Sequence, residues 1–394
     1  MKYLTKISLM VFAFLVIPFL LTAQVNQEVT VGVDGDYPTL TDFIAELDTL
    51  GMGGNTTVSI ISDIIEPGTV QITQWFELFG AGYYLTIKPA NGSWTIEAAV
   101  DTGAVIELNW VSRVIIDGEY NVGERNLTII NTATGGTNAA IWIASVSPGQ
   151  RCNDITIKNT NIVGSNTPQS NTETAGIAAN NVPFSLNYSG FNDNIIIQNN
   201  HIKRANYGVI VVGVPSPGMT NNGIQIIGNV IGSDNENEYI RFKGIRVFAT
   251  PQVVITDNHI YNIKRSEGMY NICGLELSMY GYGAQVLRNK IHGLENASPD
   301  GGGAYGIDIP IPVSVDTMYI MNNIIYDIRT INYSPTNYNQ NPFGIRILGT
   351  TKLKLWYNSV NLYGSQVDVG TAGTLSAAIA FIAPIYYELD MRNN

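Results

Sequence analysis

Two short sequence patterns alternate along this chain with a drifting period, and this repeat limits the possible folds more than any other feature. The first pattern is apolar-x-apolar-x-x-Asn-x-[Ile/Val], and its asparagines are separated by 29, 29, 31, 34 and 35 residues. The second pattern, [Gly/Ala]-apolar-x-apolar, alternates with the first. Both have the period of two that is typical of short strands with one buried face. The asparagines, here called the ladder asparagines, are Asn200, Asn229, Asn258, Asn289, Asn323 and Asn358.

A repeat of this length without helical periodicity leaves a β-solenoid or a β-propeller. A propeller blade needs four strands joined by hairpins, and hairpin turn signals are missing between the patterns. The sequence therefore predicts a right-handed parallel β-helix, with one Asn-centred strand and one Gly-led strand in each rung. We expect the ladder asparagines to point into the coil and to satisfy one another's amides. The glycine of the second pattern is expected to permit a sharp corner before its strand.

The two ends of the repeat differ. Residues 39–51 have the only credible helical pattern, with Thr39 as N-cap and Gly51 as the stop, and a helix there would cap the first rung. The expected organisation is a signal peptide at 1–23, an N-terminal strand and capping helix at 24–57, and rungs at 58–394. The sequence stops at Asn394 within an asparagine pattern, so we expect the natural chain to continue.

The first residues indicate the compartment. Lys2 and Lys6 precede an apolar run that ends in the small residue Ala23, which is typical of a secretory signal peptide cleaved after that residue. The alternative is a membrane anchor, but an apolar run of about 15 residues that contains Pro18 is short for a bilayer span. We expect a secreted or cell-surface protein whose mature chain does not span a membrane.

The net charge limits the partners that this protein can bind, and the cysteine content limits its disulfide chemistry. Without the two signal lysines, 19 basic residues face 32 acidic ones, which argues against binding to nucleic acid or anionic membranes. The two cysteines, Cys152 and Cys273, would form a disulfide by default in an oxidising compartment. The repeat places them about four rungs apart, roughly 19 Å, which is beyond disulfide reach. We therefore expect two free, buried thiols.

The opening segment from Val33 to Ile44 resembles the first rung and cap helix of pectin-lyase-like β-helix proteins. Val114-Ile-Ile-Asp-Gly118 and the asparagine repeat fit the same superfamily. Residues 29–394 as a whole resemble large secreted bacterial β-helix proteins with a type IX secretion sorting tail. That resemblance implies delivery to the cell surface or medium, with the tail downstream, but no activity. The catalytic motifs of pectin methylesterases, polygalacturonases and pectate lyases are absent from the sequence.

The third place of the Gly pattern is expected to point outward, because the second and fourth places are apolar. In four successive rungs this place holds a charge, and we call these residues the charged strip. Neighbouring carboxylates flanked by arginines could perform acid–base chemistry on a uronic sugar, or bind calcium, although no calcium motif supports the latter. The alternative is a salt-bridged surface ladder. The strip consists of Arg246, Glu276, Asp308 and Arg346.

Further candidates surround the strip. Inserted loops swell toward the C-terminus, and Tyr270, Tyr305, Tyr333 and Tyr338 would wall a groove over the strip and stack on sugar rings. The three histidines, His201, His259 and His292, are expected to be surface residues, and no metal site is predicted. His201 and His259 would lie two rungs apart, too far for one zinc ion.

Three hypotheses about function follow from the sequence. The first is a non-catalytic, adhesin-like β-helix that contacts polysaccharide or another surface, with Arg246, Glu276, Asp308, Arg346, Tyr305 and Tyr333 as ligand contacts. The second is a divergent polysaccharide lyase or glycoside hydrolase that uses the four strip residues in the same groove. The third is a structural spacer. None of the three requires a cofactor.

Overall fold

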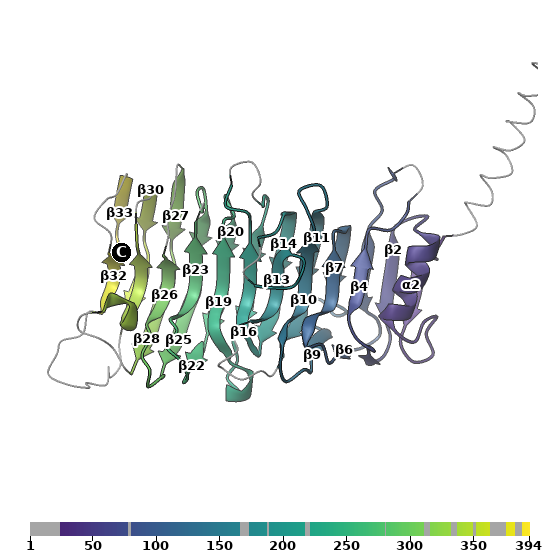
Figure 1. The fold of residues 1–394 in the computed structure, drawn as a ribbon, viewed down its shortest axis with the longest axis horizontal. Helices are drawn as coiled ribbons and strands as arrows, with labels where there is room; N and C mark the ends of the chain where they lie inside the picture. The colour runs from purple at the N-terminus through teal and green to yellow at the C-terminus, as the bar shows by residue number, and fades with distance from the viewer. Residues whose placement is uncertain are drawn as a thin grey trace, which may run out of the picture.

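The computed structural model describes residues 24–394 except 78–79, 166–172, 187–188, 217–220, 280, 311–315, 332–336, 350–351, 363–375 and 383–387. The described part is a right-handed parallel β-helix, an elongated coil whose walls are three parallel sheets (Figure 1). We number the sheets 1, 2 and 3 in the order in which the chain passes through them within each rung. Neighbouring strands of one sheet therefore come from successive rungs. The predicted fold class is confirmed.

The strands are short and their order in each sheet follows the sequence. Sheet 1 contains β1 (Glu28–Val31), β2 (Thr56–Ile60), β5 (Leu85–Pro89), β8 (Ser112–Asp117), β11 (Cys152–Lys158), β14 (Asn192–Gln198), β17 (Gln225–Ile227), β20 (Val254–Thr256), β24 (Gln285–Leu287), β27 (Thr317–Met321), β30 (Lys352–Trp356) and β33 (Glu388–Arg392). Sheet 2 contains β3 (Ile64–Ile65), β6 (Trp94–Ala98), β9 (Leu127–Asn131), β12 (Thr160–Val163), β15 (His201–Lys203), β18 (Val230–Ile231), β21 (His259–Tyr261), β25 (Lys290–Asn296), β28 (Ile324–Thr330) and β31 (Ser359–Asn361), with β22 (Lys264–Arg265) paired to β25. Sheet 3 contains β4 (Val70–Thr73), β7 (Thr102–Asn109), β10 (Thr137–Ser145), β13 (Thr174–Asn181), β16 (Ala205–Val212), β19 (Ile240–Phe248), β23 (Ile272–Ser278), β26 (Ala304–Ile309), β29 (Pro342–Ile347) and β32 (Ala377–Phe381).

Each rung has three strands, because the asparagine pattern, which was expected to form one strand, is divided between two sheets. Asn200, for example, lies at the corner between β14 of sheet 1 and β15 of sheet 2. The residue before it, Asn199, has a φ of 51°, in the left-handed region that Asn, Asp and Gly adopt most easily. This one residue turns the chain sharply enough to start a new strand, so a rung has three strands.

The ladder asparagines form one buried column along the sheet 1–sheet 2 corner. Asn258 Oδ1 accepts from the backbone N–H and the Nδ2 of Asn229, at 2.9 and 3.0 Å. Its own Nδ2 donates to Asn289 Oδ1 and to the carbonyl oxygen of Ile226, both at 2.9 Å. Asn394 continues the same bonds beyond Asn358. The column satisfies the polar groups that the corner would otherwise bury without partners.

The glycines of the second pattern serve close packing rather than a corner. Gly244 lies inside β19, and a Cβ built on it would come within 2.5 Å of Ile260 Cγ2 and 2.6 Å of the carbonyl oxygen of Gly274. The same kind of contact, with the Ile or Val two residues after a ladder asparagine, occurs at Gly176, Gly208, Gly274, Gly306 and Gly344. The expected corner is therefore wrong, and the glycine column makes room for side chains from sheet 2.

A capping helix closes the N-terminal end of the coil, as the sequence predicts (Figure 1). Helix α2 (Leu40–Leu50) begins after the N-cap Thr39 and ends at Gly51, and its buried face comprises Leu40, Phe43, Ile44 and Leu47. The carboxylate of Glu66, only 3% exposed, accepts the backbone N–H groups of Leu40 and Thr41 at 2.7 and 3.2 Å. The carboxylate thus provides acceptors for backbone N–H groups that have no partner within the first turn of the helix.

Both cysteines are buried and free, in β11 and β23, which confirms the predicted thiols. The proposed signal peptide lies outside the described residues. No helix in the described part of the chain is long and apolar enough to cross a bilayer.

Candidate functional site

The charged strip is aligned as the repeat predicts. Arg246 pairs with Glu276, Glu276 with Asp308, and Asp308 with Arg346 in the register of sheet 3. The column extends in both directions from the strip through apolar and polar residues. Its other members are Glu107, Trp142, Ala178, Ile210 and Ala380.

The expectation that the strip lies on an open outer surface is wrong. Glu276, Asp308 and Arg346 are 6%, 3% and 4% exposed. They point away from the coil interior, but neighbouring outward side chains contact them, as Lys243 does at Glu276 and Tyr305 at Arg346. In the earlier rungs the same face carries a second apolar core, in which Trp142 and Ile210 pack with Leu186.

Each carboxylate of the strip is paired with a cation. Glu276 binds Arg246 at 3.0 Å and also contacts the Nζ of Lys243, which the sequence analysis missed. Asp308 accepts two hydrogen bonds from Arg346, from Nε at 2.8 Å and Nη2 at 2.7 Å. These are the two arginine pairings that a salt-bridged ladder predicts. A parallel fork of this kind fixes both side chains.

Lys243 was missed because a second outward column breaks the period of two. The residue before each glycine of the second pattern also points outward, so Lys243 stands beside Cys273 and Cys273 beside Tyr305. Strict alternation would place these residues in the coil interior. A change in backbone direction at the glycine turns these side chains to the outside. In the sequence, their position directly before a Gly is the only sign of this orientation.

Tyr305 does not belong to an exposed loop, contrary to the expectation. It lies in β26, is fully buried, and has the guanidinium of Arg346 3.7 Å from its ring centroid. Its hydroxyl donates to the carbonyl oxygen of Asn339 at 2.8 Å and accepts from Arg346 Nη1 at 2.9 Å. Tyr333 and the side chain of Tyr338 lie outside the described residues.

A pocket of about 320 Å³ lies over the strip, lined by Lys243, Glu276, Asp308 and Arg346 together with Phe242 and Tyr270. Burial raises the pKa of Asp308, against the opposing effect of Arg346. Burial also acts to raise the pKa of Glu276, but Lys243 and Arg246 outweigh it and hold that pKa below its ordinary value. The pocket thus contains two carboxylates whose pKa values move in opposite directions.

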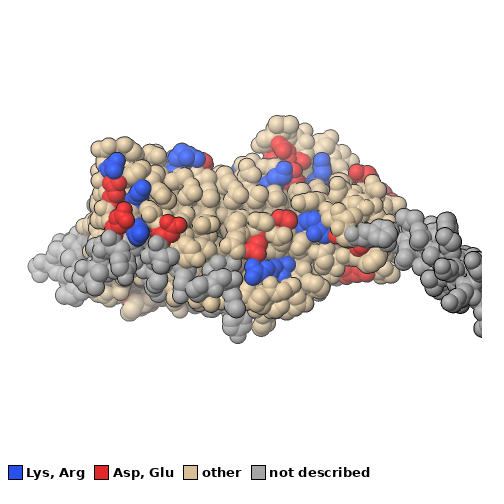
Figure 2. All heavy atoms as spheres, turned by 90° about the horizontal axis from the view of Figure 1, so that it is seen from above, with Lys and Arg blue, Asp and Glu red and all other residues tan. Residues whose placement is uncertain are grey.

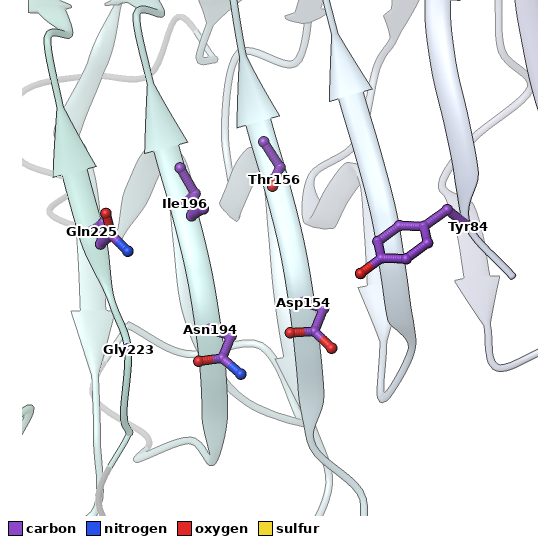
Figure 3. A pocket seen from close by; sticks show the side chains of 7 residues that line it. All are labelled: Tyr84, Asp154, Thr156, Asn194, Ile196, Gly223 and Gln225. Atoms are coloured by element: carbon purple, nitrogen blue, oxygen red, sulfur yellow. The ribbon is translucent and has the colours of Figure 1, made fainter. Parts of the chain in front are cut away.

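A second hollow, which the sequence analysis did not anticipate, lies on the outer face of sheet 1. This sheet 1 groove has a volume of about 310 Å³ and its lining is mostly uncharged. Figure 3 shows the tyrosine ring lying across β8 toward the carboxylate on β11, with the amides on the strands beyond. The lining residues are Tyr84, Asp154, Thr156, Asn194, Ile196, Gly223 and Gln225.

Local backbone conformation places the polar residues of the groove. Asp154, Asn194 and Gly223 have φ values of 56°, 51° and 64°, so each adopts the left-handed conformation that short polar residues and glycine tolerate. They occupy equivalent positions at the start of successive rungs in sheet 1. A Cβ at Gly223 would come within 2.4 Å of Asn194 Oδ1. The absence of a side chain at Gly223 therefore keeps this end of the groove open. These residues look like ordinary turn residues in the sequence.

Neighbouring residues fix the backbone around Tyr84, although its side chain is 37% exposed. The Tyr84 N–H donates to Asn55 Oδ1 at 2.9 Å, and its carbonyl oxygen accepts from the Thr56 N–H at the same distance. Arg113 on β8 donates to the carbonyl oxygen of Tyr83 at 3.1 Å and forms an ion pair with Glu77. These bonds hold the Tyr84 backbone at the edge of the groove and leave its ring accessible to a ligand.

The surface charge is sparse and mixed. Figure 2 shows acidic and basic residues next to one another in small groups, with wide uncharged areas between them. Many of the charges on this fold are paired across rungs, as in Arg151–Asp193 and Arg288–Asp257. A large field of one sign that would attract a polyanion or a polycation is absent from the face shown in the figure.

The three histidines lie on the outer side of sheet 2, as predicted. His201 and His259 both pair with Val230 and are therefore two rungs apart. His292, however, approaches His259, with 2.8 Å between their Nε2 atoms. Burial lowers the pKa of both, that of His292 to about 4. No group of three or more His, Cys, Asp or Glu residues suited to a metal ion exists among the described residues.

No protein-family model and no curated protein matches the chain. Solved structures of similar fold include the GH136 lacto-N-biosidase from Eubacterium ramulus, at 9% identity and a TM-score of 0.49 over 93% of this chain and 68% of that one. They also include the surface adhesin PfbA of Streptococcus pneumoniae (10% identity, TM-score 0.43, covering 90% and 92%). A third is the A-module of the Azotobacter vinelandii mannuronan C-5 epimerase AlgE4 (12%, 0.32, covering 85% and 91%). All three TM-scores lie below 0.5 and all three identities are 12% or lower, so no property of this chain is inferred from these likenesses.

Proposed function

We propose that this protein is a secreted or cell-surface β-helix that binds a glycan without modifying it, and that the sheet 1 groove makes the main contact. The observation that supports this most is the contrast between the two hollows. Polar groups of the sheet 1 groove are accessible, and Asp154 is in no ion pair among the described residues. The charges of the strip are buried and already bound to each other.

The chemistry of the groove matches a hydroxyl-rich ligand. The Tyr84 ring offers an apolar face to a pyranose, while Asp154, Asn194 and Gln225 offer planar acceptors and donors to hydroxyl groups. The only ionised side chain in the lining is a carboxylate, so a uronic polymer is repelled and a neutral glycan is favoured. Residues on successive rungs of sheet 1 can contact an extended chain that runs along the coil axis.

The test is a screen of the mature protein against neutral and uronic glycans, followed by calorimetry on the best ligand. Tyr84→Ala should weaken binding by about tenfold or more, equivalent to about 1.4 kcal/mol. Tyr120→Ala is the matched control, because Tyr120 is 49% exposed but lies outside the groove. Equal affinities of the wild type and Tyr84→Ala would exclude the groove as the binding site, and preference for uronic polymers would exclude the charge argument.

A divergent polysaccharide lyase or glycoside hydrolase is the second candidate, favoured by the pocket over the strip. There the pKa of Asp308 is raised and that of Glu276 is lowered, which is how a carboxyl pair divides the roles of acid and base. Asp308→Asn keeps an oxygen acceptor for Arg346 but cannot exchange a proton. If the wild type cleaves any polymer of the screen and folded Asp308→Asn does not, the enzymatic function replaces the binding function. A protein that neither binds nor cleaves any glycan is a spacer.

A further inference from the structure

The outer side of sheet 2 brings two of the three histidines of this chain together. His259 on β21 and His292 on β25 come from successive rungs, and their Nε2 atoms are 2.8 Å apart. Their ring centroids are 5.0 Å apart, so the two ε edges face each other. With neutral rings, one Nε2–H donates to the other nitrogen.

Flanking aromatic rings hold the pair in place. Tyr261 stacks on His259 at 4.7 Å, and Tyr326 stacks on His292 at 4.6 Å, with interplanar angles of 18° and 5°. Each histidine is therefore stacked on one tyrosine, and the four rings lie on three successive strands of sheet 2. A histidine pair that is already converged loses less conformational entropy on binding an ion than two independent side chains do.

We propose that His259 and His292 bind one divalent transition-metal ion through their Nε2 atoms, with Cu(II) preferred. Two metal–nitrogen bonds of about 2.05 Å place the nitrogens about 2.9 Å apart at a right angle and about 3.3 Å apart at a tetrahedral angle. The observed 2.8 Å fits the right angle, which is the angle of tetragonal Cu(II) and Ni(II). Each ring turns about its Cβ–Cγ bond, a broad torsion, to aim its lone pair at the ion.

The choice of metal follows from the donor set. Imidazole nitrogen suits copper, nickel and zinc, and among divalent ions copper binds such sites most strongly. No third His, Cys, Asp or Glu completes a ligand set in the described part of the chain, so water or a donor of another molecule fills the remaining positions. A bound ion would therefore keep open coordination positions on the outer surface of the coil.

The experiment titrates Cu(II) into the mature full chain in a weakly chelating buffer, with calorimetry and electron paramagnetic resonance as readouts. We expect one ion per chain and hyperfine splitting from two imidazole nitrogens. His259→Gln and His292→Gln should each weaken binding by about tenfold or more. His201→Gln is the matched control, because it is the only other histidine and its ring contacts the carbonyl oxygen of Gly232 instead.

Three outcomes would overturn the proposal. They are an absence of stoichiometric binding by the wild type, a resonance spectrum with fewer than two coupled nitrogens, and affinity unchanged in His259→Gln and His292→Gln. The first outcome would mean that the pair is only a hydrogen-bonded part of the aromatic stack. The spectrum of the wild type decides the question even if a variant does not fold.

Discussion

Replacing one ladder asparagine, Asn258→Ala, tests whether the column holds the rungs together. The change removes four hydrogen bonds of 2.9–3.0 Å. Two of the four partners keep other bonds: Asn229 Nδ2 still donates to the carbonyl oxygen of Ile197, and Asn289 Oδ1 still accepts the backbone N–H at position 258. The backbone N–H of Asn229 loses its acceptor, whereas the carbonyl oxygen of Ile226 lies in β17, which is paired with β20.

The magnitude follows from the backbone N–H of Asn229. A buried polar group without a partner costs about 1–3 kcal/mol, so the variant should lose at least about that amount in its free energy of unfolding. The cavity left by the amide adds to this loss unless water enters it. Asn161→Ala is the matched control, because Asn161 is half-buried and its Nδ2 donates only to the carbonyl oxygen of Arg125. That control should lose less than about 1.5 kcal/mol.

Urea unfolding followed by circular dichroism at near- and far-ultraviolet wavelengths measures both variants. Coincident curves at the two wavelengths are required, because solenoids can unfold in parts. A loss for Asn258→Ala no larger than that for Asn161→Ala would refute the reasoning. The amide column would then be a consequence of the coil rather than a cause of its stability.

Three further predictions concern the coil and the strip. Gly244→Ala should lower the melting temperature, since its Cβ would meet Ile260 Cγ2 at 2.5 Å; overpacking costs about 1–3 kcal/mol, and an unchanged melting temperature would contradict the packing role. Burial raises the pKa of Cys152 to about 12 and that of Cys273 well above its ordinary value, so neither thiol should react with a thiol reagent in the native protein at pH 8. Both should react after denaturation without reductant, and fewer than two reactive thiols would contradict the structure. Glu276→Gln should cost about 3 kcal/mol of stability at pH 7 because it removes the buried carboxylate that pairs with the half-buried Lys243 and Arg246, whereas the more exposed Glu295→Gln should cost at most about 1 kcal/mol. The pKa of Glu276 is lowered from 4.5, so its contribution is full above that pH and is lost as the pH falls through the lowered pKa; a difference between the two variants that grows as the pH falls below 4.5 would contradict this assignment.

The sequence predicts the coil well because the coil interior repeats. Each rung places Asn, Ile and Gly at equivalent positions, so the ladder corner, the core face and the register of the charged strip follow from spacing alone. The capping helix is also predictable, since Thr39, the apolar face and Gly51 are local signals. The number of strands per rung cannot be read from the sequence in the same way, because a single left-handed residue such as Asn199 divides one pattern into two strands.

The burial of the strip could not be predicted, because side chains that contact it occupy positions that a period of two assigns to the coil interior. Lys243 and Tyr305, each directly before a Gly, are examples. Asp154 and Asn194 drew no prediction, because a single Asp or Asn in a sequence looks like an ordinary turn residue. They form the wall of a groove only because left-handed residues in successive rungs stand side by side and Tyr84 reaches across from an earlier rung.

The contrast between strip and groove follows from the cost of burying charge. Because Glu276 and Asp308 are buried, their carboxylates must be paired, and Lys243, Arg246 and Arg346 pair with them. A ligand could bind these charges only by breaking the ion pairs. The free energy needed to break a buried pair is larger than the free energy gained from one new contact. Asp154 and Asn194 stay partly or fully exposed, so they can exchange water for hydroxyl groups at little cost. We therefore expect a ligand to contact the accessible residues of the sheet 1 groove rather than the paired charges of the strip.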